Sequence, residues 1–298
     1  MITTSQSLAP HRVAAVQMVS TASVETNLAA AKRLVAMAAD QGAALIALPE
    51  YFCLMGHADT DKVAAREREG AGPIQDFLAE CAARHRVWLV GGTVPIEVDD
   101  PAISQTKVRN TTFVFDPDGK VAARYDKIHL FGFQKGDEQY DESRTIAPGN
   151  APVSFIADFA SQSASPHTSQ PLRIGLTICY DLRFPELYRS LAKADETGIN
   201  TALIIVPSAF TYTTGRVHWE ILLRARAIEN QCYILAPAQG GRHENGRRTW
   251  GHSMLIDPWG EIIALLPEGE GVVIGELDPT RIAEVRENLP ALKHRVMS

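Results

Sequence analysis

The chain has 298 residues, of which 45 % are apolar and 21 % charged, a balance typical of a globular protein with a sizeable core. Its formal net charge is −6, and because the two signs are interleaved without a basic stripe, we expect no nucleic-acid partner. No apolar run approaches the roughly 20 residues that span a bilayer, and the opening MITTSQSLAPHR lacks signal-peptide features. We therefore expect no membrane partner.

The cysteines are scattered along the chain and form no C-x-x-C pair. This spacing argues against both a disulfide framework and a zinc knuckle, so we predict no bound metal and a reducing, cytoplasmic location. The four positions are Cys53, Cys81, Cys179 and Cys232.

The first segment reads as a strand, a helix and a second strand. An apolar strand is predicted over 12–18, and a helix begins near Ser23 and stops at Gly42. A buried strand over 43–50 then ends in a carboxylate, Glu50. Because ligands of such a βαβ unit gather beyond the carboxyl ends of its strands, Glu50 lies where chemistry is expected. The alternative is a solvated loop glutamate.

A helix, a strand and a hairpin are predicted next. The helix covers 73–85, and the strand covers 87–94. Two apolar runs around the turn residues 116–119 predict the hairpin. Lys127 follows its second strand, where an exposed, solvated side chain is the alternative.

The segment over 131–149 is rich in charged residues and contains several glycines, and its apolar residues follow no helical or strand periodicity. A loop of this length in a compact domain predicts a lid or a binding loop. A strand is expected at 151–159, and the polar patch at 161–170 is interpreted as a surface excursion rather than a boundary. We therefore predict a single domain over 1–298.

A strand, a sharp turn and a helix are predicted between 173 and 190. Apolar side chains alternate with small ones, the pattern breaks at Cys179, and apolar positions then recur at helical spacing. A thiol at the start of a helix meets the positive end of its dipole and free backbone N–H groups, which would lower its pKa. Cys179 is therefore a candidate nucleophile, and a small core residue is the alternative.

The rest of the chain repeats the order of the first segment. A strand–helix–strand unit carries Cys179 as the earlier one carries Glu50, which indicates a weak internal duplication. The remaining elements are a strand over 201–210, a long helix over 217–231, strands over 232–240, 253–267 (with a hairpin turn at Asp257–Gly260) and 271–278, and a last helix over 279–288.

A thiol, a carboxylate and an ammonium, each just past a strand end, suit acyl transfer at an amide carbon. Glu50 would take the proton of the Cys179 thiol as a general base. The Lys127 ammonium and the backbone N–H of Tyr180 would stabilise the oxyanion of the tetrahedral intermediate.

Three motifs resemble a known family. Glu50 in LPEYF, Lys127 in YDKIHLF and Cys179 in CYDLRFPE resemble the Glu–Lys–Cys triad of the carbon–nitrogen hydrolase (nitrilase) superfamily. The flanks LLRARAIENQCYILAPAQGG and WGHSMLIDPWGE are similar to its Nit branch. In DESRTIAPG, the resemblance implies that Glu142 orients Lys127 and the substrate by hydrogen bonding.

The resemblance also implies the architecture and the partners. We expect a four-layer α-β-β-α sandwich, a small-molecule amide substrate and no cofactor. Members of the family pair through helices, which implies a homodimer or a larger homo-oligomer. The last helix and tail, about 280–298, are candidates for the subunit interface.

Two substrate classes compete within the branch. Deaminated glutathione amidases release Cys-Gly from a 2-oxoglutaryl peptide, and omega-amidases hydrolyse 2-oxoglutaramate. The segments RARAIENQCY and GRHENGRRTWGHSM resemble the former more closely. The motifs are also compatible with an N-carbamoyl amino acid hydrolase, and the fold with a non-catalytic binding or scaffold protein.

Four residues that follow the candidate nucleophile in the sequence are predicted to contact the substrate. Arg183 would receive a substrate carboxylate by a bidentate contact, or else would pair with Glu186 or Glu220. The remaining candidates for substrate binding are Tyr180, Phe210 and Thr211.

Overall fold

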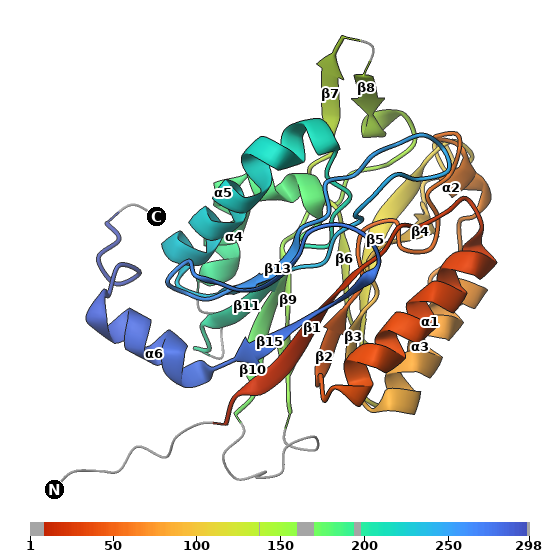
Figure 1. Cartoon of the computed structure of the whole chain (residues 1–298). Coiled ribbons are helices and arrows are strands. Elements are labelled where there is room, and N and C mark those ends of the chain that lie inside the picture. Colours follow the sequence, from red (N-terminus) through yellow and green to blue (C-terminus); the bar gives the residue numbers. More distant parts are fainter. Residues whose placement is uncertain (1–8, 137, 160–169, 194–197, 297–298) are drawn as a thin grey trace, which may run out of the picture.

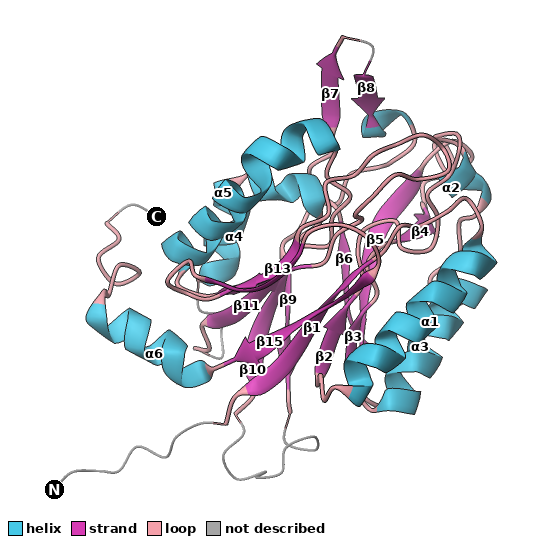
Figure 2. Ribbon diagram, viewed as in Figure 1, coloured by secondary structure: helices cyan, strands magenta, loops and turns pink. Residues whose placement is uncertain are grey.

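The computed structural model describes residues 9–136, 138–159, 170–193 and 198–296. Two β-sheets lie face to face at its centre, and helices cover their outer faces (Figures 1 and 2). Helices α1 (Val24–Asp40) and α3 (Pro73–His85) cover one sheet, and α4 (Pro185–Ala192) and α5 (Tyr212–Asn230) cover the other. This arrangement is the expected four-layer α-β-β-α sandwich.

The first sheet has the strand order β15-β1-β2-β3-β5-β4, with β6 also paired to β5. Strands β1, β2 and β3 run parallel, and the outer pairs are antiparallel. The bounds are β1 His11–Gln17, β2 Leu45–Ala47, β3 Trp88–Val90, β4 Val94–Glu97, β5 Val108–Phe115, β6 Val121–Asp126 and β15 Gly271–Leu277.

The second sheet has the order β14-β13-β12-β11-β10-β9. Its central strands β10, β11 and β12 run parallel, and the rest are antiparallel. The bounds are β9 Val153–Ala157, β10 Leu172–Leu176, β11 Thr201–Ile205, β12 Tyr233–Ala236, β13 Ser253–Ile256 and β14 Ile262–Leu266.

Each sheet contains one of the two predicted βαβ units. The crossover β1-α1-β2 lies in the first sheet and β10-α4-β11 in the second, each joining parallel strands. The predicted internal duplication is therefore confirmed. Because the sheets are stacked, the loops that follow β2 and β10 come together at one end of the sandwich, where Glu50 and Cys179 lie.

The side chains of β1 show how the layers are held together. Val13 and Ala15 belong to the core between the two sheets, whereas Ala14 and Val16 belong to the core beneath α1 and α3. This alternation follows from the two-residue period of a strand. Both faces are apolar because helices or a second sheet cover each of them.

The strand predicted over 87–94 is in fact two strands, β3 and β4. Gly92 separates them with a φ of +53°, and a Cβ at this position would lie 2.2 Å from the carbonyl oxygen of Pro49. Only glycine allows this close approach at low cost. The break therefore lets the loop that carries Glu50 pack against the end of β3.

The segment 131–149 is more ordered than the predicted loop. It contains the hairpin β7 (Gly132–Lys135) and β8 (Glu138–Asp141), followed by a 3-10 turn over Glu142–Arg144. The hairpin projects from the end of the sandwich (Figure 1). Most of its side chains are partly or fully exposed, so it lacks the apolar alternation that identifies a strand in a sequence.

Helix α5 begins earlier than the predicted 217. Thr211 is its N-cap, and its hydroxyl accepts a hydrogen bond from the backbone N–H of Thr214 at 3.3 Å. The first turn was missed because threonine and glycine are weak helix formers. The short α2 (Asp61–Ala64) was also missed, and α6 (Pro279–Asn288) matches its prediction.

The polar patch at 161–170 lies outside the described residues except for Gln170, so its interpretation stays a prediction. Within the described ranges, no helix is both long enough and apolar enough to cross a membrane.

Candidate active site

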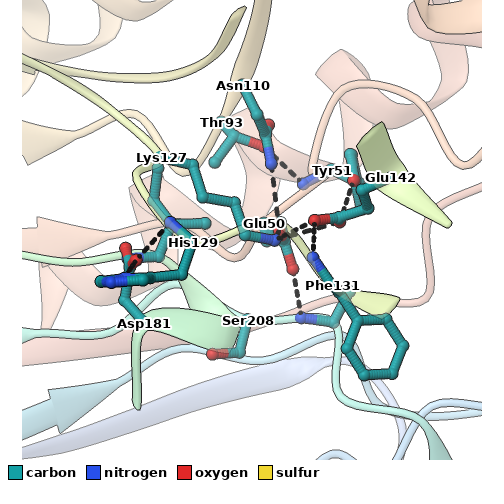
Figure 3. A network of polar contacts seen from close by, with 12 residues as sticks. Glu50, Tyr51, Thr93, Asn110, Lys127, His129, Phe131, Glu142, Asp181 and Ser208 are labelled. Atoms are coloured by element: carbon teal, nitrogen blue, oxygen red, sulfur yellow. Dashed lines mark hydrogen bonds and ion pairs between the residues drawn. The ribbon is translucent and has the colours of Figure 1, made fainter. Parts of the chain in front are cut away.

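The three motif side chains converge at one end of the sandwich. Glu50 follows β2, Lys127 follows β6 and Cys179 follows β10. Glu50 and Cys179 line the same cavity, and Lys127 reaches Glu50 from behind it (Figure 3). The structure therefore brings together three residues that are far apart in the sequence.

Glu50 is held by donors on both of its carboxylate oxygens. Its Oε1 accepts hydrogen bonds from Lys127 Nζ at 2.8 Å and from Asn110 Nδ2 at 3.0 Å. Its Oε2 accepts from the backbone N–H of Ala209 at 2.9 Å. Because Glu50 is only 1 % exposed, these contacts fix its orientation inside the cavity wall.

Glu142 holds the other side of the same ammonium group. Lys127 Nζ donates to both oxygens of Glu142, at 3.0 and 2.8 Å. The hydroxyl of Tyr51 donates to Oε1 and the backbone N–H of Phe131 donates to Oε2, each at 2.8 Å. Glu142 is the first residue of the 3-10 turn after β8, so the hairpin segment supplies part of the site.

The charges of this cluster set its protonation states. Burial alone would lower the pKa of Lys127, but the charges of Glu142 and Glu50 outweigh burial and raise it above its ordinary value. Burial would likewise raise the pKa of Glu142, but Lys127 and the hydrogen bonds to Glu142 hold it below its ordinary range. Lys127 is therefore an ammonium and Glu142 a carboxylate at neutral pH.

Cys179 differs from the sequence expectation in its surroundings. It lies in a 3-10 turn, Cys179–Arg183, and the α-helix begins only at Pro185 because Phe184, ahead of the proline, has a non-helical backbone with φ −112° and ψ 87°. The positive end of the α4 dipole is therefore not at the thiol. Cys179 has a φ of +48°, a conformation that side-chain-bearing residues adopt rarely and mostly at functional sites.

The pKa of Cys179 also corrects the expectation. Burial, followed by the charge of Glu50, raises the pKa of the thiol well above its ordinary value, and Lys127 opposes this only in part. The resting sulfur is therefore a neutral thiol. It needs a base at the moment of attack, and Glu50 is the carboxylate beside it in the cavity wall.

Asp181 connects the loop that carries Lys127 with the turn that carries Cys179. It is fully buried, and its Oδ2 accepts from Tyr125 Oη at 2.7 Å and from the backbone N–H of Ile178 at 2.9 Å. Its Oδ1 accepts from the backbone N–H of His129 at 3.0 Å and lies 2.7 Å from the ring Nδ1 of the same residue. These contacts fix the segments on either side of the site (Figure 3).

The cavity covers about 310 Å³ of space that is in part open to solvent. Apart from Lys127, which is fully buried behind Glu50, every predicted site residue lines it. These residues are Glu50, Glu142, Cys179, Tyr180, Arg183, Phe210 and Thr211.

Arg183 has no ion pair with either of its two suggested acidic partners within the described chain. One guanidinium nitrogen lies 3.3 Å from His218 Nδ1, and the group stands over the rings of Tyr180 and Phe210 at 5.7 and 5.5 Å. Glu220 pairs instead with Arg224. The guanidinium is therefore available to an anion in the cavity.

Several lining residues were not predicted. Tyr51, Phe131, Thr214 and Arg247 line the cavity, and Asn110 lies behind Glu50. Tyr51 adjoins Glu50 in the motif LPEYF, which was the available signal. Arg247 comes from a long loop between β12 and β13, and only the fold places it here. Within the described ranges, no group of three His, Cys, Asp or Glu side chains is placed to hold a metal ion.

Comparison with known proteins agrees with this site. Residues 12–287 match the family described as Carbon-nitrogen hydrolase, so the chain belongs to that family. Enzymes of this class cleave carbon–nitrogen bonds with water.

Curated relatives and a solved structure match nearly the whole chain. A deaminated glutathione amidase from Synechocystis sp. is 40 % identical over 96 % of this chain and 98 % of its own. The human deaminated glutathione amidase is 35 % identical over 95 % of this chain and 81 % of its own. The crystal structure of Saccharomyces cerevisiae Nit3, a member of branch 10 of the nitrilase superfamily, is 30 % identical with a TM-score of 0.80, covering 98 % of this chain and 99 % of that one.

Proposed function

We propose that this chain is an amidase that hydrolyses deaminated glutathione, 2-oxoglutaryl-Cys-Gly, through a thioester on Cys179. The observation that carries the chemistry is a buried thiol on a cavity wall beside the Glu50–Lys127–Glu142 ion-pair cluster. The substrate is supported by the names of the two curated relatives, which match the chain over nearly its full length.

In the first half of the reaction, Cys179 Sγ attacks the amide carbonyl and its proton passes to Glu50. The Lys127 ammonium and the backbone N–H of Tyr180 stabilise the oxyanion. Collapse of the tetrahedral intermediate breaks the carbon–nitrogen bond, and Glu50 gives the proton to the departing amine of Cys-Gly. A 2-oxoglutaryl thioester remains on Cys179.

In the second half, Glu50 removes a proton from water, and the oxygen attacks the thioester. Collapse releases 2-oxoglutarate, and the proton returns from Glu50 to the sulfur. Glu142 takes no proton in this scheme, because its task is to hold Lys127 in place through two hydrogen bonds. The cycle uses only the residues of this chain and water.

Arg183 is proposed to bind the carboxylate of the 2-oxoacyl group. It lines the cavity from the same turn as the nucleophile, and its nearest described neighbours are aromatic rings and a histidine rather than carboxylates. Tyr180, Phe210 and Thr211 complete this side of the pocket.

The test compares kcat/KM for deaminated glutathione and 2-oxoglutaramate with the purified full chain. We expect the larger value for deaminated glutathione, and a larger value for 2-oxoglutaramate would assign an omega-amidase instead. Cys179→Ala should abolish turnover and keep the folded far-UV spectrum. Cys81→Ala is the matched control, because Cys81 is a buried thiol of α3 that does not line the cavity. Hydrolysis retained in Cys179→Ala would refute the mechanism.

We further propose a homodimer that forms through the outer face of α5. A row of apolar side chains on this helix faces solvent, and Ile228 lies against Gly260, next to Trp259. Exposed apolar patches of this kind mark protein interfaces. The exposed fractions are 52 % for Val217, 69 % for Ile221, 49 % for Ile228 and 50 % for Trp259.

Sedimentation velocity tests the dimer. Ile221→Asp should shift the chain to the monomer, whereas Met37→Asp, which places the same charge at an exposed apolar position on α1, should not. A monomeric unsubstituted chain would contradict the proposal. The tail at 280–298 is proposed as a further contact, since Leu289 and Val296 are exposed there.

A cytoplasmic location is also proposed. It is supported by the four cysteines, all of which are unpaired and buried. Fractionation of cells that produce the chain would test it, and recovery outside the cytoplasm would contradict it.

A further inference from the structure

A second cavity adjoins the active-site cavity. It covers about 320 Å³ of space that is in part open to solvent, and Tyr51 and Arg247 line both cavities. Tyr51 and Arg247 are therefore the side chains at which the active-site cavity and the second cavity meet.

The second cavity is lined by two cationic side chains, Lys62 and Arg247, and by one carboxylate, Asp59. Lys62 is 17 % exposed and donates to Thr145 Oγ1 at 3.2 Å, and its ion pair with Asp59 is long, at 3.8 Å, to a carboxylate that is 63 % exposed. The other cationic side chain of the second cavity is Arg247.

Arg247 forms no ion pair with an acidic side chain in the part of the chain that the structure describes. Its guanidinium stands over the ring of Tyr140 at 5.0 Å, and one nitrogen lies 3.8 Å from the sulfur of Met55. Arg247 also forms a side-chain hydrogen bond with Tyr140, so its partners are a phenol and a thioether rather than a carboxylate. A half-buried guanidinium with such partners can still form a bidentate, charge-assisted contact with a carboxylate.

The two arginines border the active-site cavity from different elements. Arg183 belongs to the turn of the nucleophile, whereas Arg247 belongs to the loop between β12 and β13 and borders the second cavity as well. An amide with a carboxylate on each side of the scissile bond would place one anion at each guanidinium.

We propose that the second cavity is the subsite for the leaving amine, and that Arg247 binds the carboxylate at the end of that amine. This inference rests on the proposed function, because 2-oxoglutaryl-Cys-Gly carries one carboxylate on the acyl side and one on the glycine. Arg247 is thus a specificity residue that favours amides with an anionic leaving group over amides that release a neutral one.

The experiment compares two substrates that differ only in the charge of the leaving group. One is 2-oxoglutaryl-Cys-Gly, and the other is the same peptide with its glycine carboxylate converted to a carboxamide. For the unsubstituted chain, we expect kcat/KM for the acid to exceed that for the carboxamide by about tenfold or more, as for other charge-assisted contacts.

Arg247→Gln should bring this ratio close to one, mainly through a rise in KM for the acid, and Arg247→Lys should restore part of it. Arg242→Gln is the matched control, because it removes the same charge from the same loop at an exposed position that lines neither cavity. It should keep the ratio of the unsubstituted chain. Because the readout is a ratio of two substrates on one protein, a partial loss of folded enzyme does not alter it.

The outcomes separate this inference from the proposed function. An unsubstituted chain that cleaves neither peptide contradicts the proposed function. A chain that cleaves both peptides, with the same ratio in Arg247→Gln as without the substitution, contradicts only the subsite. An equal loss on both substrates also overturns it, because the role of Arg247 would then be structural.

Discussion

Lys127 Nζ lies 2.8 Å from Glu50 Oε1, and the two side chains are 0 % and 1 % exposed. The distance is that of a charge-assisted hydrogen bond, and burial removes the water that would weaken it. The proposed base and the proposed oxyanion donor are therefore one rigid unit, and changing either partner alters the other.

Removing the ammonium should affect both catalysis and stability. In Lys127→Met, Glu50 and Glu142 would be left as two buried carboxylates without a cation, which costs about 3–5 kcal/mol for a buried pair. We expect kcat to fall far more than KM rises, because the contact of the ammonium with the oxyanion exists only in the transition state. Steady-state kinetics and urea unfolding measure the two effects.

Lys120→Met is the control for this prediction. Lys120 lies in the turn before β6 and is exposed, so its loss should leave both kcat and the unfolding free energy close to those of the unsubstituted chain. A Lys127→Met variant that changes KM alone would show that Lys127 acts in ground-state binding.

Glu142 should contribute to stability in a pH-dependent way. Lys127 and neighbouring donors hold its pKa below the ordinary value of 4.5, so its ionised form is favoured in the folded state. Its contribution is present above pH 4.5 and is lost as the pH falls through the lower folded value. The difference in unfolding free energy between the unsubstituted chain and Glu142→Gln should therefore be nearly constant down to about pH 5 and shrink as the pH falls further, through and below 4.5.

Glu138→Gln is the matched change in β8, the strand just before the turn of Glu142, where Glu138 accepts a hydrogen bond from Thr213 at 2.8 Å. It should not reproduce the acid dependence. A constant difference for Glu142→Gln across this pH range would show that the charge of Glu142 is not coupled to Lys127.

Sequence reasoning located the reactive groups better than it located their surroundings. Glu50 and Cys179 each follow an apolar run that ends abruptly, and Lys127 follows the second strand of a hairpin marked by its turn residues, so their places at strand ends were readable. The order of βαβ units then placed Glu50 and Cys179 at equivalent ends of two sheets. Local patterns were sufficient here because strand ends are local features.

The surroundings depend on contacts between distant segments. Arg247 reaches the cavity from a loop without periodic structure, and the hairpin that positions Glu142 is exposed on both faces. The pKa of Cys179 was predicted in the wrong direction, because burial and the nearby Glu50 outweigh the local turn. None of these effects has a signal in the adjacent sequence.

Glu50→Gln should separate the acidity of the thiol from catalysis. Because the charge of Glu50 helps to raise the pKa of Cys179, removing that charge should lower this pKa while it abolishes turnover. The pKa of Cys179 is measured from the ultraviolet absorbance of its thiolate as a function of pH. The spectrum of the double variant Glu50→Gln, Cys179→Ala is subtracted from that of the single variant Glu50→Gln, which leaves the signal of Cys179. The same difference with Glu50 intact gives the reference value.

The other thiols provide an internal comparison. Burial raises the pKa of Cys81 to about 11 and that of Cys53 to about 12, and neither thiol lines the active-site cavity. Their titration should not move in Glu50→Gln. If the pKa of Cys179 stays the same or rises in this variant, Glu50 is not the carboxylate that controls the thiol.

We expect Asp181 to contribute strongly to the free energy of unfolding, although it does not line the active-site cavity. Its two carboxylate oxygens accept hydrogen bonds from Tyr125, His129 and Ile178, and the carboxylate is fully buried. In Asp181→Asn, one oxygen becomes an amide nitrogen that faces donors, so a loss of about 3 kcal/mol is expected for hydrogen bonds to a charged group. The turn of Cys179 should loosen, and kcat should fall with it.

Tyr125→Phe tests the same network from its other end. It removes a single donor to Asp181 and should cost less, about 1–2 kcal/mol. Because the two residues are in contact, the double variant should lose less stability than the sum of the single losses, a coupling that urea unfolding measures directly. If the losses of stability add strictly, the Tyr125 hydroxyl and the Asp181 carboxylate act independently. If Asp181→Asn is as stable and as active as the unsubstituted chain, the carboxylate does not hold the turn of Cys179 in place.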